Sequence, residues 1–364
     1  MDTLTHALVG AALSDGVFRK RLGRVATPFA LVAASLPDVD IVTYFINAES
    51  AWAYHRGYTH SIAPQLLAAP ILGYVGYRLA GRMGSCLQWA LLALFCLVSH
   101  TLGDLATSWG TMPLLPFSNI RVSWDLLPII DIFLTGVTGA SFVVNRVLRR
   151  EKVDTFDNPM AFPVVHRYPK RRHVAMWWAR VSLVVVCLYL LVAVQQHAQT
   201  VRVAREQLNA NGVDAVEVRA FPILFNYIAW VIAARDAEGA VYNAESSSYA
   251  PQAMHFIRFP AARGAEVDKA LSTADGRMFV WYSQGMFVAE EDPEPGVSVR
   301  LSDRRFFALS SPKRSRFIMD FAKTPSGDME RVAARQLAFE GVDVWEEVRL
   351  LWELTKTGYA HPPE

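Results

Sequence analysis

The sequence contains little cysteine, and its few cysteines are poorly placed for disulfide or metal chemistry. Of 364 residues only three are cysteine, and Cys86, Cys96 and Cys187 lie in or beside apolar runs without a Cys-x-x-Cys pair. This spacing supports neither a disulfide framework nor a zinc site built from thiolates. A metal site in this chain therefore has to draw on histidine and carboxylate ligands.

Charged residues are also scarce for a chain of this length. Only 19% of the residues are charged, whereas 52% are hydrophobic, and the mean hydropathy is positive at +0.19. This balance is too apolar for an ordinary soluble enzyme and favours a membrane protein. An acid, Asp2, stands where a signal peptide has its basic region, so we expect no secretory signal and anchoring by internal spans.

The basic residues are clustered rather than abundant. The net charge is only +2, yet the runs RKRLGR, RVLRREK and RYPKRRH concentrate the lysines and arginines beside apolar segments. These runs lack the interleaved aromatic residues on which bases stack, so we expect no nucleic-acid partner. Beside hydrophobic spans, basic residues mark the cytoplasmic side of the membrane.

Six apolar segments can be drawn. They cover residues 4–17, 25–46, 62–80, 87–102, 126–148 and 174–194. The first is too short to cross a bilayer core of about 30 Å at about 1.5 Å per residue. When the basic stretches are placed on the cytoplasmic side, the other segments cross the membrane in alternating directions, as consecutive spans must. We therefore expect an α-helical, multi-pass domain in a bacterial inner (plasma) membrane.

The character of the chain changes after residue 194. A polar helical stretch leads into segments that we interpret as β-rich, such as VEVRAFPILFNYIAWVIAAR, RMFVWYSQGMFV and RFIMDFAK, separated by turn sequences. We expect a soluble, mixed, mostly antiparallel domain that is extracytoplasmic, because the last span runs outward. The predicted units are a membrane domain (1–150), a basic cytoplasmic loop with the last transmembrane helix (151–199) and a C-terminal domain (200–364).

Acids and histidines interrupt the apolar part where a membrane chain should not have them. An ionisable group at membrane depth costs on the order of a few kcal/mol unless it is paired or metal-bound, so each is a functional-site hypothesis. The topology, assigned from lysine and arginine alone, gathers nine of them on the outer face. They are His6, Asp38, Asp40, His55, His60, His100, Asp104, Asp125 and Asp131.

The stretch SHTLGD places a histidine and an acid one helical turn apart. His100 and Asp104 are four residues apart and therefore share a helix face, with about 5–6 Å between their Cβ atoms. A ring nitrogen and a carboxylate oxygen at this spacing can both reach one divalent ion. The alternative is a buried His–Asp hydrogen bond, or a carboxylate that caps the following loop.

The stretch HRGYTHS supplies two more histidines and an arginine. Thr59 is the expected N-cap of the following span, which would hold His60 at a helix start. Arg56 is a planar, bidentate donor suited to a phosphate group. The alternative is an interfacial loop in which His55 and Arg56 meet lipid headgroups.

Four more acids lie at helix breaks or helix starts. Pro37 interrupts an apolar run, and in an extended stretch the carboxylates of Asp38 and Asp40 would face the same way, toward a cavity. The alternative is a helix break stabilised by side-chain caps. Asp125 fits the N-cap of the next span, whereas Asp131 lies deeper in that span and is harder to explain by capping.

The motifs LTHALVG, LPDVD, HRGYTHS, SHTLGDLATSWG and WDLLPIID, in this order, resemble the YdjM-like family of inner-membrane metal-dependent hydrolases, which is also described as LexA-binding. The resemblance covers about residues 1–150. More distantly, the ligand order resembles the all-helical fold of zinc-dependent phospholipase C and P1 nuclease. That resemblance implies a helical core with zinc bound by Asp40, His60, His100 and Asp104, and a second ion partly held by His6 with Asp104 bridging.

We interpret the chain as a membrane-bound metal-dependent hydrolase of a phosphoester, with a lipid or membrane-proximal substrate. One or two zinc ions are expected, and manganese or iron use the same ligand types. Arg56 would bind substrate, while the remaining acids and histidine orient ligands or act as base. These are Asp38, His55, Asp125 and Asp131.

Two other functions stay open at the level of sequence. The ionisable residues also suit a metal or proton transporter, and the spans also suit an anchor that presents the C-terminal domain. Most candidates lie at one interface rather than at the bilayer midplane, which favours hydrolysis over transport. A cytoplasmic protein partner, implied only by the family description, would contact the basic loop between residues 146 and 173.

Overall fold

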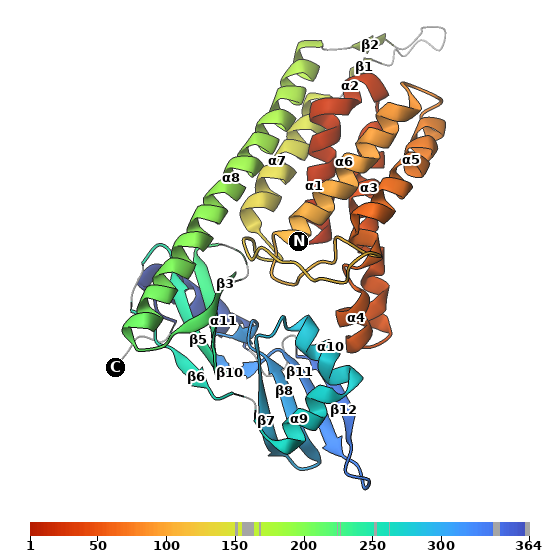
Figure 1. The fold of residues 1–364 in the computed structure, drawn as a ribbon. Helices are drawn as coiled ribbons and strands as arrows, with labels where there is room; N and C mark the ends of the chain where they lie inside the picture. The colour runs from red at the N-terminus through yellow and green to blue at the C-terminus, as the bar shows by residue number, and fades with distance from the viewer. Residues whose placement is uncertain are drawn as a thin grey trace.

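The computed structural model describes two parts, a helical N-terminal part and a β-rich C-terminal part joined by one long helix (Figure 1). The description covers residues 1–149, 152–154, 164–166, 169–223, 225, 227–250, 253–261, 263–337 and 343–360. Most of the basic cytoplasmic loop expected after residue 150 lies outside these residues. A short antiparallel pair, β1 (Lys152–Asp154) with β2 (Val164–His166), falls within that region.

The helical part begins with a continuous helical run. It consists of α1 (Thr3–Leu13), a π-helical turn (Ser14–Phe18) and α2 (Arg19–Leu22). Next come α3 (Ala26–Ser35), a 3₁₀ helix (Leu36–Phe45), α4 (Ala48–Tyr54) and a 3₁₀ turn (Tyr58–His60). The remaining helices are α5 (Ile62–Leu79), α6 (Cys86–Leu105), α7 (Ile132–Leu148) and α8 (Pro169–Ala210).

Within the described residues, three helical stretches are long and apolar enough to cross a membrane. They are Ala26–Phe45, Cys86–Leu105 and Lys170–Ala210, and α7 is a shorter apolar helix. The prediction of membrane helices is therefore confirmed in its coarse form. The number of crossings and their direction stay predictions, because α5 does not meet these criteria and α7 begins only at Ile132.

Small residues let the helices of this part approach closely. A Cβ atom placed on Gly10 of α1 would lie 2.6 Å from the Cβ of Ala34 in α3. One placed on Gly73 of α5 would lie 2.4 Å from the backbone nitrogen of Ala90 in α6. Glycine and alanine at such contacts are the usual means by which membrane helices pack, since lipid provides no hydrophobic drive for association.

Helix α8 is much longer than a membrane requires. Its 42 residues extend about 63 Å at 1.5 Å per residue, against a hydrocarbon core of about 30 Å. Ala204 and Leu208, near its end, are fully buried in a core that they share with the first C-terminal sheet. The boundary expected at residue 199 thus falls inside this helix, which carries the chain into the C-terminal part.

The C-terminal part contains two four-stranded antiparallel sheets. One has the order β3 (Ala215–Pro222), β4 (Ala229–Asp236), β5 (Val241–Ser247), β6 (Ile257–Phe259). The other has the order β12 (Met329–Gln336), β11 (Phe317–Lys323), β8 (Val297–Asp303), β7 (Phe287–Glu294). The strands β9 (Phe307–Ala308) and β10 (Ser311–Ser315) form a separate pair, and α9 (Ala265–Ser272), α10 (Ala274–Tyr282) and α11 (Val344–Thr357) complete the part.

The expectation of a mostly antiparallel, β-rich domain is confirmed, with one local error. Alternating burial along β8 is the period-two pattern of a strand with one buried face. The segment RMFVWY, however, which we interpreted as β-rich, is helical in α10. Thr273 caps this helix by accepting a hydrogen bond from the backbone of Gly276, and Phe279 and Tyr282, three residues apart, share its buried face.

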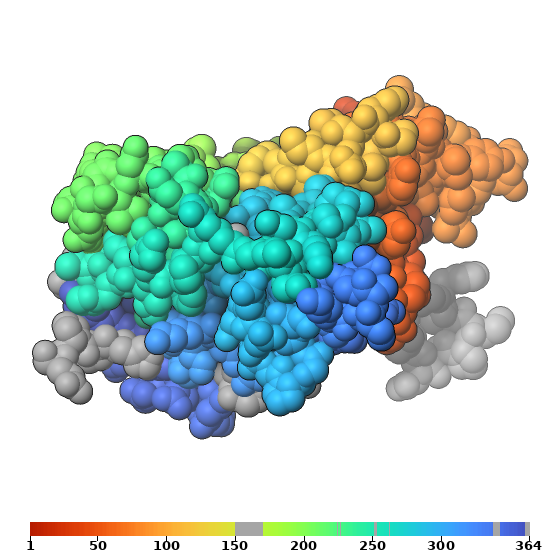
Figure 2. Space-filling model, turned by 60° about the horizontal axis from the view of Figure 1, so that its bottom comes forward, coloured from red at the N-terminus to blue at the C-terminus, as the bar shows by residue number. Residues whose placement is uncertain are grey.

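The two parts share a hydrophobic core at the end of the bundle where α4 stands. Trp52 of α4 is fully buried, stacks on Tyr282 with 5.1 Å between ring centroids, and shares this core with Trp109 and Phe317. In the space-filling view (Figure 2), the cyan and blue atoms of the C-terminal part lie directly against orange and yellow atoms of the N-terminal part. The C-terminal part is thus packed on this end of the helical part.

Truncating Trp52 should loosen this junction. Trp52→Ala leaves a cavity in a fully buried core, so we expect a loss of about 3–5 kcal/mol and a clearly lower thermal unfolding midpoint in detergent. Trp345→Ala is the control, because that side chain is 82% exposed and should change stability by less than about 0.5 kcal/mol. Equal midpoints for Trp52→Ala and wild type would contradict a shared core.

Candidate metal centre

Four side chains from three segments place their ligand atoms together at the end of the helical part. Asp38 comes from the 3₁₀ helix, His60 from the 3₁₀ turn before α5, and His100 with Asp104 from the last turns of α6. One ligand atom from each lies within 4.8 Å of all the others. His60, His100 and Asp104 are buried, while Asp38 is half-buried.

The spacing of these atoms suits a single small cation. The Nε2 atoms of His60 and His100 are 3.0 Å apart, and Oδ2 of Asp104 lies 2.9 Å and 3.5 Å from them. Oδ1 of Asp38 lies 3.3 Å from Nε2 of His100 and 3.8 Å from that of His60. Tetrahedral ligands bound to zinc at 2.0–2.2 Å are about 3.3–3.6 Å apart, so the observed distances bracket that value.

The second ring nitrogen of each histidine has its own partner. Nδ1 of His100 lies 2.6 Å from the backbone carbonyl of Ala34, to which it can donate. Nδ1 of His60 lies 2.9 Å from the hydroxyl of Thr59 and 3.2 Å from Oδ2 of Asp40. Carbonyls and carboxylates in this position fix the ring orientation of metal-binding histidines. Both Nε2 atoms are thereby directed to the cluster.

Asp104 is oriented so that only one of its oxygens is fully compensated. Its Oδ1 contacts the N-terminal amine of Met1, lies 3.0 Å from Nη2 of Arg56 and lies 3.1 Å from Nε2 of His6. Its Oδ2, which is in the cluster, has no hydrogen-bond partner among the described atoms, although the side chain is completely buried. A buried carboxylate oxygen left in this way fits a cation as its partner.

Asp38 and Asp40 point in different directions, so the expectation that they face the same way is wrong. They lie in a 3₁₀ helix rather than an extended stretch, and residues two apart in a helix with about three residues per turn differ by roughly 240° in direction. Asp38 reaches the cluster and accepts a 2.5 Å hydrogen bond from Thr3. Asp40, which the resemblance placed among the ligands, instead contacts the outer nitrogens of His55 and His60.

Asp40 ties together the loop that carries the histidines. Its Oδ2 accepts hydrogen bonds from the backbone of Arg56 and the hydroxyl of Thr59, at 2.9 Å and 2.7 Å. Its Oδ1 lies 2.7 Å from Nδ1 of His55. Thr59 is therefore not the N-cap of α5; that position belongs to Ser61. The sequence pointed to Thr59 as a helix cap, whereas in the structure its hydroxyl donates to Asp40.

Two histidines outside the membrane helices have shifted pKa values in opposite directions. Burial lowers the pKa of His55, although Asp40 partly counteracts this. Burial would also lower the pKa of His60, but the nearby carboxylates of Asp104, Asp38 and Asp40 outweigh it and raise that pKa to about 10. His60 therefore stands in a strongly negative environment, which attracts cations.

His6 and Arg56 lie next to the cluster rather than within it. The ring of His6 stacks on that of His100 with 3.6 Å between centroids, and its Nε2 faces Oδ1 of Asp104. Arg56 is 4% exposed and donates to the hydroxyl of Thr107 at 2.6 Å. Sequence reasoning missed two threonines, Thr3, which donates to Asp38, and Thr107, which accepts from Arg56. Only their contacts in the folded chain distinguish them from other threonines.

Asp125 and Asp131 have structural partners elsewhere. Asp125 receives two hydrogen bonds from Arg219 of β3, at 2.6 Å and 3.0 Å, which connect the two parts of the molecule. Asp131 is the N-cap of α7, accepting from the backbone of Leu134, and it also accepts a 2.5 Å hydrogen bond from Tyr189. The N-cap role that we assigned to Asp125 therefore belongs to Asp131, and both carboxylates are engaged away from the four-atom cluster.

Comparison with known proteins places the helical part in a family. A family model described as YdjM inner membrane protein matches residues 1–200. A curated relative, the "Uncharacterized protein YfhP" of Bacillus subtilis (strain 168), is 31% identical over 144 residues, which cover 37% of this chain and 43% of the relative. The chain thus spans less than half the length of that relative. No solved structure matches the chain, and the likeness to the phospholipase C and P1 nuclease fold stays a prediction.

Metal content should distinguish Asp38 from Asp40. We expect Asp38→Ala and His100→Ala to abolish stoichiometric zinc, because each removes a ligand atom of the four-atom cluster. Asp40→Ala should weaken zinc affinity by about 10- to 100-fold, as loss of a ligand-orienting partner does. The measurement is elemental analysis of purified protein with a zinc titration.

The control is His255→Ala, whose exposed side chain lies in the C-terminal part and should not affect metal content. If Asp40→Ala removes the metal while Asp38→Ala keeps it, the roles of the two carboxylates are reversed. A wild-type protein without stoichiometric metal after mild purification would contradict the whole assignment.

Proposed function

The chain belongs to the YdjM inner membrane protein family, and we propose that it is a membrane-bound, metal-dependent hydrolase of a phosphoester. The observation that carries the proposal is the buried cluster of two histidine nitrogens and two carboxylate oxygens at tetrahedral spacing. Isolated buried charges are too costly to keep without a role. The outer hydrogen bonds of both histidines support a metal rather than a simple His–Asp pair.

Asp38, His60, His100 and Asp104 would hold the metal. Two nitrogen and two oxygen donors suit zinc best, and manganese or iron accept the same donors. When bound, such a metal supplies Lewis-acid polarisation of a phosphoryl oxygen and makes a nucleophile accessible near neutral pH. With Oδ1 of Asp104 occupied by Arg56 and His6, the chain offers Oδ2 alone to the cation.

His55 is our candidate for the general base. Its Nδ1 contacts Asp40 at 2.7 Å, the arrangement in which a carboxylate orients an imidazole and leaves Nε2 to exchange a proton. Its ring lies 6.1 Å from the ring of His60, beside the cluster but not in it. Burial keeps the pKa of His55 below its usual value, so the ring is neutral and can accept a proton at neutral pH.

Arg56 supports a phosphoester as the substrate class. Its guanidinium holds Asp104 through Nη2 and Thr107 through Nη1, but its buried Nε has no hydrogen-bond partner among the described atoms. An anionic oxygen next to the metal would satisfy that donor, and a guanidinium is the preferred donor for phosphate oxygens. Arg56 would thus both position Asp104 and contact the substrate.

The position of the cluster favours hydrolysis at an interface over transport. His60 lies in the turn before α5, and His100 and Asp104 lie in the last two turns of α6, whereas Asp38 lies inside the stretch Ala26–Phe45. Transporters place their ion sites near the middle of broken helices, at the bilayer midplane. Three of the four ligands thus lie at helix ends, which would meet the lipid headgroup region, where a phosphoester of a lipid or of a membrane-proximal molecule is available.

The orientation of the bundle can be tested with reporter fusions. We expect a fusion after Arg149, at the lysine- and arginine-rich end, to report a cytoplasmic position. A fusion after Gly212, beyond α8, should report an extracytoplasmic one. Paired alkaline phosphatase and fluorescent-protein reporters measure this directly. An intracellular signal at both positions would remove the outer-face location from the proposal.

Mutant activity should separate the base from the ligands. On a panel of phospholipids and soluble phosphoesters, His55→Ala should lower kcat by about 10²- to 10⁴-fold while metal content stays at the wild-type level, since only proton transfer is lost. Asp38→Ala should remove both metal and activity. Arg56→Lys keeps the charge but loses the planar fork, so kcat/KM should fall with the metal retained.

The matched control is again His255→Ala, which should keep both metal and activity. If His55→Ala retains full activity on a substrate that Asp38→Ala cannot hydrolyse, His55 is not the base. A metal-loaded wild-type protein that hydrolyses nothing across the panel would argue against a phosphoesterase.

A further inference from the structure

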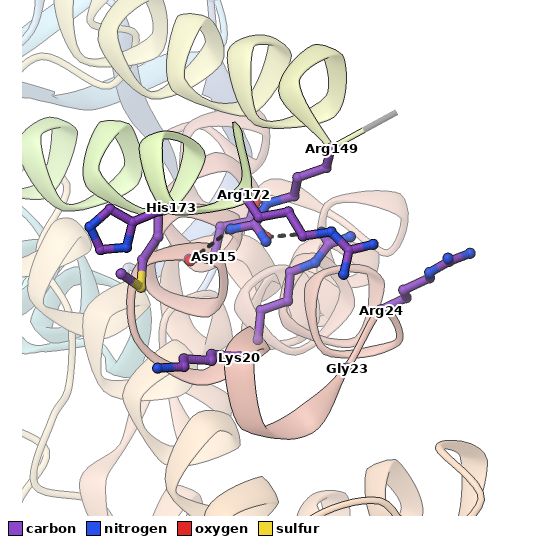
Figure 3. Close-up of a pocket in the computed structure, with 9 residues that line it drawn as sticks. Asp15, Lys20, Gly23, Arg24, Arg149, Arg172 and His173 are labelled. Atoms are coloured by element: carbon purple, nitrogen blue, oxygen red, sulfur yellow. Dashed lines mark hydrogen bonds and ion pairs between the residues drawn. The ribbon is translucent and has the colours of Figure 1, made fainter. Parts of the chain in front are cut away.

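A second polar site lies at the opposite end of the helical part. A cavity of about 390 Å³ is lined there by five cationic side chains and one carboxylate (Figure 3). These residues are Arg19, Lys20, Arg24, Arg149, Arg172 and Asp15. None of them belongs to the metal cluster, and the continuous run from α1 to α2 separates His6 from Arg19 by about 20 Å at 1.5 Å per residue.

The floor of this cavity is built with defined contacts. Asp15 is 3% exposed, and its Oδ1 accepts hydrogen bonds from Nη1 of Arg19 at 2.9 Å and from the hydroxyl of Thr27 at 2.7 Å. It lies in the π-helical turn, a local irregularity that is frequent at functional sites. Asp15 is therefore already engaged by Arg19 and Thr27, and it offsets only part of the positive charge of the lining.

Arginines from two other helices complete the site. Figure 3 shows Arg149 coming from the end of α7 and Arg172 from α8, around Asp15. Arg149 is held by Asn145 at 3.2 Å and by the backbone carbonyl of Asp15 at 3.3 Å. Burial lowers the pKa of Arg149; Asp15 counteracts this, and Arg19 and Arg172 lower it further. The positive charges of Arg19, Arg149 and Arg172 are thus close enough to act on one another.

The site stands at the level of a membrane interface. His173 and Met176 also line the cavity, and the next residues of α8, Trp177 and Trp178, are half-exposed. Trp177 donates to the ring of His173 at 2.9 Å. Tryptophans on the surface of a membrane helix gather at the headgroup level. Basic pockets between helices at this level are the usual sites for anionic lipid headgroups.

We propose that this cavity binds the phosphate group of an anionic glycerophospholipid, with the acyl chains along the apolar surface of α8. The cationic lining provides several donors for phosphate oxygens, and guanidinium groups can bind them bidentately. The location between α2, α7 and α8 would let the bound lipid hold these helices together. This lipid is a structural ligand, distinct from any substrate at the metal centre.

The test uses the full chain, purified in mild non-ionic detergent and delipidated. The probes are short-chain phosphatidylglycerol, short-chain phosphatidylcholine and inorganic phosphate, with binding followed by native mass spectrometry and by the thermal unfolding midpoint. We expect phosphatidylglycerol to bind and to raise the midpoint, and the other two probes to bind at least tenfold more weakly. Inorganic phosphate binding as tightly as the lipid, or phosphatidylcholine binding equally, would overturn the lipid assignment.

Variants locate the binding. The double variant Lys20→Gln with Arg172→Gln removes two charges from the cavity and should lower the affinity for phosphatidylglycerol at least tenfold. Its matched control, Arg21→Gln with Arg82→Gln, removes two exposed charges at the same end outside the cavity and should stay within twofold of wild type. Equal losses in both would show general surface attraction and overturn the proposal.

The charge-keeping exchange Lys20→Arg with Arg172→Lys guards against misfolding. It should bind phosphatidylglycerol like wild type, and the single variant Arg172→Gln should lose part of the affinity even if the double variant does not fold. Unchanged affinity in Arg172→Gln and in the double variant would place the lipid elsewhere.

Discussion

The burial of the Asp104 carboxylate is the constraint on which the site depends. A completely buried carboxylate at the end of an apolar helix is tolerated only with charged and hydrogen-bonding partners around it. Arg56 and His6 serve Oδ1, whereas Oδ2 faces two histidine nitrogens without hydrogen-bond geometry. The position of Arg56 in turn requires the loop after α4, which adopts φ 61° at this residue. Asp40 holds that loop by accepting from the backbone nitrogen of Arg56.

The helical part supplies the rigidity that such a site needs. Catalytic and metal sites must keep their groups within fractions of an ångström, and groups on packed helices are held better than groups on loops. The close approach of α1 to α6 at Gly103, where an added Cβ atom would lie 3.1 Å from Cε1 of His6, brings His6 beside His100. The close approach of α5 to α6 at Gly73 fixes His60 relative to α6. The small residues in these helices therefore let the histidines of the metal centre and their neighbours come together.

Much of the site could be predicted because it depends on spacing within one element. His100 and Asp104 share a helix face by the i, i+4 rule, and the structure places their ligand atoms 3.5 Å apart. The division of labour between Asp38 and Asp40 could not be predicted, because a ten-residue 3₁₀ helix is uncommon and apolar residues such as Val39 and Ile41 also suit an extended stretch. Three-dimensional contacts, not local pattern, decide which carboxylate meets the histidines.

The fold could be predicted by class and less well by element. Antiparallel strands followed from period-two alternation, but RMFVWY suits a strand and a helix equally until Thr273 caps α10. The full length of α8 could not be predicted from hydropathy, because its last turns are polar on one face and bury Ala204 and Leu208 against the first sheet. Asp125 appeared to be a site residue because its partner, Arg219, is 94 residues away in the sequence.

The packing of the two parts on each other reaches the candidate site through one side chain, Trp109. The ring of Trp109 lies 6.1 Å from that of His55 and 5.5 Å from that of Tyr282 in α10. It also lies 5.3 Å from Phe317 of β11, so a single buried tryptophan touches both the His55–Asp40 pair and the C-terminal core. A close-packed aromatic core transmits changes in position because it cannot deform without losing contacts. The C-terminal part therefore helps to fix the ring that would serve as base, and the two parts of the chain are packed together at the site.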